Sequence, residues 1–167
     1  AYTVQVSVTG AGIAPTGTVT LSDGDGNTTP ITLSGGTGSG SLTGTAAGAK
    51  NLTAAYGGDA NYLSAVDSEP HTVNQATPTV TITSDANDPS TVGEAYSVHV
   101  AVTGPVTPTG TVAVNDGEGN IATITLAGGI GSTSLPSITA GTKTLTASYS
   151  GDSNFVSAAD TEVHTVT

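Results

Sequence analysis

The chain has 167 residues, of which 13 are Asp or Glu, two are Lys and none is Arg, so its formal net charge is −11. Nucleic-acid binding through the phosphate backbone depends on clustered Lys and Arg, and this composition excludes it. The absence of Cys excludes disulfides, thiolate metal ligands and thiol nucleophiles.

Residue types typical of strands dominate the sequence. Thr and Val are abundant, and the good helix formers Glu, Lys, Gln, Arg and Met are scarce. No apolar run approaches the roughly 18 residues of a membrane-spanning helix, so membrane insertion is not expected. The composition therefore predicts an all-β protein.

Apolar and polar residues alternate in short runs, the pattern of strands with one buried face. In the first half this alternation predicts strands at 2–9, 18–22, 30–33, 40–43, 51–56 and 64–73. Turn-forming residues separate them, as in Asp23-Gly24-Asp25-Gly26-Asn27. The second half repeats the series with an additional first strand at 79–83. Six and seven short strands at such spacing are typical of a β-sandwich.

The chain is an internal duplication. Residues 1–10 match 95–104, and residues 15–74 match 108–167 without a gap. This division predicts a first domain at 1–74, a linker at 75–78 that ends in Pro, and a second domain at 79–167. A short linker that ends in Pro favours limited hinge freedom.

The two copies differ at their start. Copy two begins with a leader, residues 77–94, that has no counterpart in copy one. We therefore expect copy one to expose an unpaired sheet edge, which invites pairing with another strand. In a complete mature subunit a neighbouring chain would fill the gap and drive polymerisation. In a piece of a longer array the preceding residues would fill it.

Two motifs carry a family resemblance. Pro108-Thr109-Gly110-Thr111-Val112 precedes an Asp-Gly turn, and the string from Ala140 to Phe155 ends in Tyr-Ser-Gly-Asp-Ser-Asn-Phe, with a matching string at 47–62. Together they resemble the bacterial Ig-like domains of group 3. The resemblance implies two tandem Ig-like Greek-key β-sandwiches, the first lacking its N-terminal strand. It also implies a place in tandem arrays of secreted or surface-anchored proteins, and no shared catalytic residues.

The Asp-Gly turns are candidate calcium sites, because oxygen-bearing side chains that alternate with Gly suit a hard cation. The candidate ligands are Asp23, Asp25, Asn27, Asp116, Glu118 and Asn120. No bidentate Glu closes either loop, so neither is an EF-hand. The alternative, a plain hairpin turn with Asp and Asn as local caps, is the favoured interpretation.

Other polar residues favour structural roles. Asp59 and Asp152 fit tight turns, and Tyr56 and Tyr149 fit core positions with tethered hydroxyl groups. The acidic segment 84–90 fits a solvated loop, with a calcium ion shared between repeats as the alternative. With no nucleophile elbow and one or two isolated His in each copy, we expect no catalysis.

These observations predict a structural, non-enzymatic segment of an extracellular, repetitive prokaryotic surface protein, as a stalk, spacer or adhesin. No cofactor is required, with calcium as an optional ligand. Two alternatives stay open: a filament subunit assembled by β-strand complementation, and a glycan- or ligand-binding module. The expected partners are neighbouring copies of the repeat or chain and a cell-surface ligand.

Overall fold

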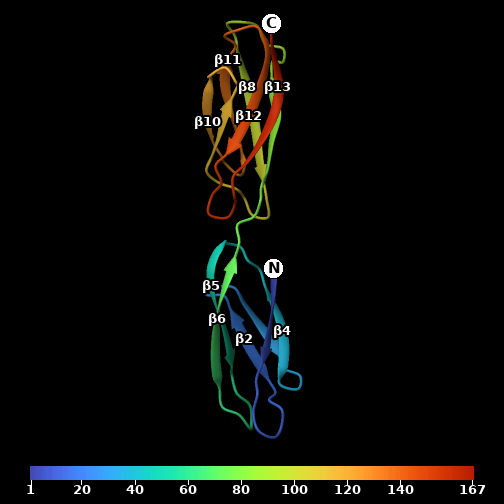
Figure 1. Cartoon of the computed structure of the whole chain (residues 1–167). Helices are drawn as coiled ribbons and strands as arrows, with labels where there is room; N and C mark the ends of the chain where they lie inside the picture. Colours follow the sequence, from blue (N-terminus) through green and yellow to red (C-terminus); the bar gives the residue numbers. More distant parts are fainter. The chain divides into compact units, whose positions relative to one another are not determined.

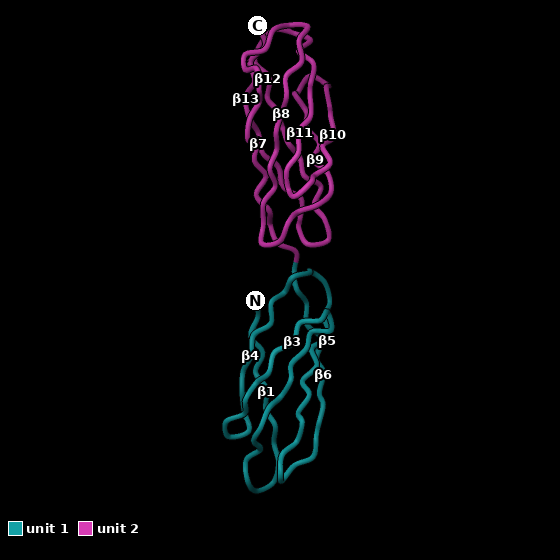
Figure 2. Tube along the Cα trace, turned by 180° about the vertical axis from the view of Figure 1, so that it is seen from behind, with its two compact units in different colours: residues 1–74 teal, residues 75–167 magenta.

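The computed structural model describes residues 1–167, which form two compact units, residues 1–74 and 75–167 (Figure 2). Every regular element is a β-strand, as Figure 1 shows. The all-β class and the two tandem sandwiches are confirmed. No helix long and apolar enough to cross a membrane is present.

Unit 1 contains six antiparallel strands in two sheets. A two-stranded sheet pairs β1 with β4, and a four-stranded sheet has the order β3-β2-β5-β6. The strands are β1 (Tyr2–Ser7), β2 (Thr18–Ser22), β3 (Thr28–Thr32), β4 (Thr37–Leu42), β5 (Gly48–Tyr56) and β6 (Ala65–Val73).

Unit 2 contains seven strands, again in two sheets. The additional strand β7 extends the smaller sheet to the order β11-β8-β7, and the other sheet has the order β10-β9-β12-β13. The strands are β7 (Thr79–Ala86), β8 (Ala95–Thr103), β9 (Thr111–Asn115), β10 (Ile121–Thr125), β11 (Ile130–Pro136), β12 (Gly141–Tyr149) and β13 (Ala158–Val166).

Alternation determines which side chains enter each core. In β8, Tyr96, Val98, Val100 and Val102 are buried and the residues between them are more exposed. Each unit has its own core cluster, and that of unit 2 includes Val80 and Ile82 of β7. Successive side chains of a strand point to opposite faces, so one face of each sheet builds the core.

Some strands begin earlier than the sequence pattern predicts. The predicted strand at 40–43 is β4, which starts at Thr37 inside a Gly-rich stretch. Gly38 lies opposite Val6 of β1, and a Cβ at Gly38 would lie 2.5 Å from Ile31 Cγ2. Glycine is therefore needed here because the strand passes over a buried isoleucine, and not because the chain turns.

A glycine also seats an aromatic side chain at the end of β8. The ring of Phe155 is 1% exposed, and a Cβ at Gly104 would lie 2.3 Å from its Cε1. Gly10 has the same relation to Tyr62 in unit 1, at 2.1 Å. The aromatic residue that ends each family motif thus packs against a backbone that carries no side chain.

We predict that Gly104→Ala destabilises unit 2 by about 2–3 kcal/mol, because overpacking a filled core displaces side chains or backbone. Calorimetry of the whole chain checks this. The control is Gly57→Ala, where an added Cβ meets nothing within 4 Å and where copy two already carries Ser150. Equal melting of the two variants would contradict the packing argument.

Candidate functional site

The carboxylate of Asp152, in the turn after β12, accepts four hydrogen bonds. Its Oδ1 accepts the backbone N–H groups of Asn154 at 2.7 Å and Phe155 at 3.0 Å, inside its own turn. Its Oδ2 accepts the backbone N–H and the hydroxyl of Thr109, both at 2.9 Å. Asp152 therefore joins the two sequence motifs of the repeat, which lie 43 residues apart.

The same arrangement recurs in unit 1. Asp59 accepts the backbone N–H groups of Asn61 at 2.8 Å and Tyr62 at 2.9 Å. It also accepts the backbone N–H of Thr16 at 2.8 Å and its hydroxyl at 2.9 Å. The turn role expected for both Asp residues is confirmed, and the bond to the distant Thr is the part that the local pattern does not predict.

These bonds favour the ionised carboxylate. Burial by itself raises the pKa of Asp152, but hydrogen bonds from Thr109 and Asn154 outweigh it and lower the pKa to about 2. In unit 1, hydrogen bonds from Thr16 and Asn61 hold the pKa of Asp59 well below its usual range.

Two buried tyrosines close the same corner. The hydroxyl of Tyr149 donates to the carbonyl oxygen of Thr109 at 2.8 Å, and that of Tyr56 donates to the carbonyl oxygen of Thr16 at 2.9 Å. Burial raises the pKa of Tyr149 to about 12. Their predicted place as core residues with tethered hydroxyl groups is confirmed.

The first Asp of each candidate calcium loop is buried and caps its own turn. Asp116, 2% exposed, accepts the backbone N–H groups of Glu118 at 2.9 Å and Asn120 at 3.2 Å and the Asn120 side-chain amide at 2.6 Å. Asp23 has the same three bonds, from Asp25 and Asn27.

The second acidic residue of each loop neutralises a lysine. Glu118 Oε1 lies 2.6 Å from Lys143 Nζ, and the Lys143 side chain is 3% exposed. Asp25 pairs with Lys50, whose side chain is 6% exposed. Hydrogen bonds from Lys143 and Thr139 lower the pKa of Glu118. The chain's two lysines therefore occupy equivalent buried positions, each with a carboxylate from the neighbouring turn.

The six candidate calcium ligands thus lie together in two groups of three, one in each unit. Their carboxylate oxygens already accept hydrogen bonds or pair with lysine, which is the arrangement that the turn interpretation requires. A bound calcium ion would compete with these bonds. Calcium binding stays the second interpretation of these loops, behind the plain turn that the sequence favours.

The leader of unit 2 builds a buried polar network with β13. The imidazole of His164, 0% exposed, has Asp85 Oδ2 at 2.9 Å from Nδ1 and Ser90 Oγ at 2.8 Å from Nε2. Ser90 also bonds the hydroxyl of Ser137 at 2.6 Å. The ring of His164 stacks on Tyr96 with centroids 3.8 Å apart.

Sequence reasoning missed this network, because Asp85 and Ser90 lie 79 and 74 residues before His164. One feature of the sequence could have indicated it: only copy two carries the leader, so only its histidine can have partners there. The segment 84–90, predicted to be a solvated loop, instead bonds its own unit. The network has the connectivity of a Ser-His-Asp triad. Ser90, however, is 1% exposed, and a nucleophile must be reached by its substrate.

Asp85, Asp88 and His164 also form a group that could hold a metal ion. One ligand atom from each lies within 4.8 Å of the others. Asp88 Oδ1 lies 3.7 Å from His164 Nδ1, and it also accepts the backbone N–H of Thr165 at 2.8 Å. The contacts within the group are a hydrogen bond between Asp85 and His164 and a capped strand end, which accounts for the cluster without a metal.

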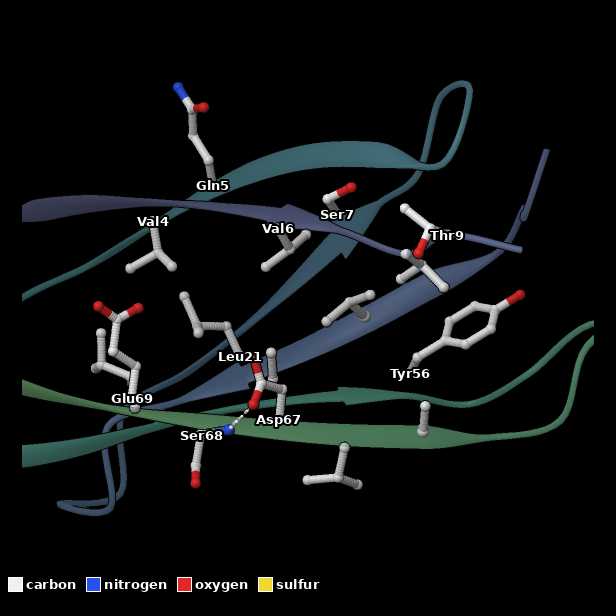
Figure 3. A pocket seen from close by; sticks show the side chains of 16 residues that line it. Val4, Gln5, Val6, Ser7, Thr9, Leu21, Tyr56, Asp67, Ser68 and Glu69 are labelled. Carbon is white, nitrogen blue, oxygen red and sulfur yellow. Dashed lines mark hydrogen bonds between the residues drawn. The ribbon is translucent and has the colours of Figure 1, made fainter. Parts of the chain in front are cut away.

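Unit 1 has a hollow where unit 2 has β7. A cavity of about 340 Å³ lies between β1 and β6 and is floored by residues of β2 and β5. In Figure 3 the side chains of Val4 and Val6 point into it, and Gln5 points away. Leu21 and Tyr56 line its floor, and Asp67 and Glu69 line one wall.

Comparison with known proteins agrees with the division of the chain into two similar β-sandwich units. The bacterial Ig-like domain (group 3) matches residues 1–81 and again residues 82–167. The chain belongs to this family. The boundary between the two family matches falls inside β7, which pairs with β8 on both sides of an irregularity between Ile82 and Ser84.

Among solved structures, the fibronectin(III)-like modules of Clostridium thermocellum CbhA are 19% identical, with 98% of this chain and 85% of that chain covered and a TM-score of 0.47. A chimeric titin Z1Z2 tandem is also 19% identical, with 99% and 90% covered and a TM-score of 0.33. No curated protein matches the chain.

We predict that Asp152→Asn destabilises unit 2 by about 2–3 kcal/mol, because the new amide would face the N–H of Thr109 donor to donor. Urea unfolding at pH 7 measures this. The control is Asp67→Asn, where the carboxylate accepts only the backbone N–H of Ser68 beside it.

The Asp152 effect should depend on pH. The carboxyl group of the unfolded chain takes up its proton near pH 4, whereas the folded group does so at about pH 2. The contribution of Asp152 is therefore present above about pH 4 and is lost as the pH falls from 4 towards 2. A difference between wild type and D152N that stays constant over that range would contradict the hydrogen-bond argument.

For the Asp-Gly turns we predict equal melting temperatures in calcium and in chelator, because their oxygens are already engaged. A specific ion would stabilise the folded chain by mass action. A rise in calcium that disappears in the double variant D23N/D116N would assign the sites to calcium and overturn this expectation.

Proposed function

We propose that this chain is a structural, non-enzymatic segment of an extracellular, repetitive surface protein, as a stalk, spacer or adhesive module. The observation that carries the proposal is the connection between the repeats. The backbone N–H of Ala76 donates to Asn154 at 2.8 Å, the carbonyl of Ala76 accepts from Val156 at 3.0 Å, and Gln75 Nε2 donates to the Asp152 carbonyl at 2.7 Å.

The segment after β6 is therefore integrated into unit 2 almost at once. Strand β6 ends at Val73, and Gln75, the first residue of unit 2, already bonds Asp152. One residue, Asn74, lies between Val73 and Gln75. A short connection between folded repeats transmits load with little slack, which suits a spacer.

Surface charge supports an exported, soluble role. With 13 acidic residues against two lysines, both of them buried against carboxylates, the accessible charge is almost entirely negative. Such a surface resists association between chains. In this role the chain needs no cofactor, and its partners are neighbouring copies of the repeat and, for an adhesin, a cell-surface ligand.

The non-enzymatic part of the proposal is supported by the environment of the Ser-His-Asp connection. Its serine, Ser90, is a buried residue of the leader and shares its hydroxyl with Ser137. The cavity in unit 1 between β1 and β6 is lined largely by aliphatic side chains and by residues of β6.

Pulling the chain from its ends by single-molecule force spectroscopy tests the spacer proposal. We expect two separate unfolding events with contour lengths in proportion to units 1–74 and 75–167. Unit 1 should yield at the lower force, because it lacks the strand that completes its smaller sheet.

Matched variants assign the two events. Asp59→Asn should weaken only the shorter event and Asp152→Asn only the longer one, because each carboxylate bonds residues of its own unit alone. A single event, or a chain that extends smoothly without force peaks, would contradict a load-bearing role.

A further inference from the structure

The entry segment of unit 2, residues 75–90, runs beside β13 in the same direction (Figure 2). Two parallel bridges mark the ends of this contact, Ala76 beside Phe155 and Ser90 beside Val166. β7 belongs to one sheet, where it pairs with β8, and β13 belongs to the other, where it pairs with β12. No backbone ladder therefore joins β7 to β13 along their length.

Backbone hydrogen bonds join the two segments only at the ends of their contact. Ala76 donates its N–H to the carbonyl oxygen of Asn154 at 2.8 Å, and its own carbonyl accepts the N–H of Val156 at 3.0 Å. At the other end, the N–H and the carbonyl oxygen of Ser90 bond residues 165–167 at 2.9 and 2.7 Å. Other groups must hold the segments together between these ends.

Three carboxylates make the contacts between these ends: Asp85, Asp88 and Asp160. Asp160 Oδ2 accepts the backbone N–H of Ile82 at 2.8 Å, where the register of β7 on β8 shifts. Asp88 Oδ1 accepts the backbone N–H of Thr165 at 2.8 Å, and Asp85 Oδ2 lies 2.9 Å from the Nδ1 of His164. β13 thus gives one carboxylate to the entry segment and receives two.

A load along the chain acts on these contacts in shear. It enters unit 2 at Gln75 and passes on from β13, just as unit 1 passes it on from the equivalent strand β6. Gln75 and the end of β13 lie at opposite ends of the unit (Figure 1). Tension therefore draws the two segments along each other in opposite directions, and the contacts between them share the load and break together.

We propose that Asp85, Asp88 and Asp160 form a mechanical clamp that sets the force at which unit 2 unfolds. The proposal rests on the spacer role and names the residues that give unit 2 its resistance to tension. Because the clamp consists of side chains, single substitutions can open it while the backbone ladders β7–β8 and β12–β13 stay in place.

The direction of pulling distinguishes a clamp from an ordinary stabilising contact. The chain has no Cys, so pairs of introduced Cys define where force is applied. Asn74→Cys with Thr167→Cys loads the entry segment against β13 in shear. Ala140→Cys with Thr167→Cys instead peels β13 from β12, starting where Gly141 pairs with Val166. All three positions are exposed.

Asp160→Ala should raise the rate of unfolding in shear at a fixed force by about tenfold, because it leaves the N–H of Ile82 without its acceptor. In the peeling direction the rate should stay as in wild type. Asp160 lies near the far end of β13 from the point where peeling starts, so its bond is still intact when the barrier is crossed. Single-molecule force spectroscopy in the two directions measures both rates.

Two further variants complete the test. Asp88→Ala should also unfold about tenfold faster in shear, so the result does not depend on one variant. The control is Glu94→Ala, which removes an exposed carboxylate of the leader outside the clamp and should match wild type in shear. A cooperative urea transition of unit 2 verifies that each variant is folded.

Two results would overturn the clamp. One is an equal acceleration by Asp160→Ala in both directions, which would make Asp160 an ordinary stabilising residue. The other is a folded Asp160→Ala and a folded Asp88→Ala that both unfold in shear at the wild-type rate. In either case a distinct unfolding event of unit 2 would leave the spacer role standing, whereas the absence of any force peak contradicts the spacer role itself.

Discussion

Each repeat depends on one carboxylate that joins two distant parts of the chain. Asp152 bonds its own turn through one oxygen and Thr109 through the other. Because the turn is held, Phe155 packs on the backbone of Gly104, and Ala76 can pair with the strand-like segment beside it. A local turn therefore determines the corner of the core and the point where the preceding segment attaches. A carboxylate suits this position because two oxygens accept four bonds.

The duplication provides an internal comparison of the same residues in two environments. His164 is fully buried between Asp85, Ser90 and Tyr96, while His71 retains only its aromatic neighbour. The difference arises from the leader alone, since the strands that carry the two histidines are equivalent.

The Ser-His-Asp connection illustrates how environment decides chemistry. Its distances are those of a catalytic relay, but Ser90 is buried within the leader and shares its hydroxyl with a second serine. Glu162, on the same strand, has its pKa raised by burial and by neighbouring Asp85, Asp160 and Asp88. Asp160 accepts the backbone N–H of Ile82 in β7, and Asp88 of the leader accepts that of Thr165 in β13, so these carboxylates join the leader to β13.

The sequence by itself determined the all-β class, the two repeats, the extra strand of copy two and the family, because alternation and turn residues are local signals. It also predicted the turn role of Asp59 and Asp152. Only the tertiary structure decided the partners of those carboxylates, the burial of Lys50 and Lys143, and the network around His164. Such contacts join residues as far as 79 positions apart, and no spacing in one sequence encodes them. The start of β4 at Thr37, inside a Gly-rich stretch, depends likewise on another strand. In a sequence, glycine indicates a turn, but here Gly38 is needed because a side chain at that position would clash with Ile31.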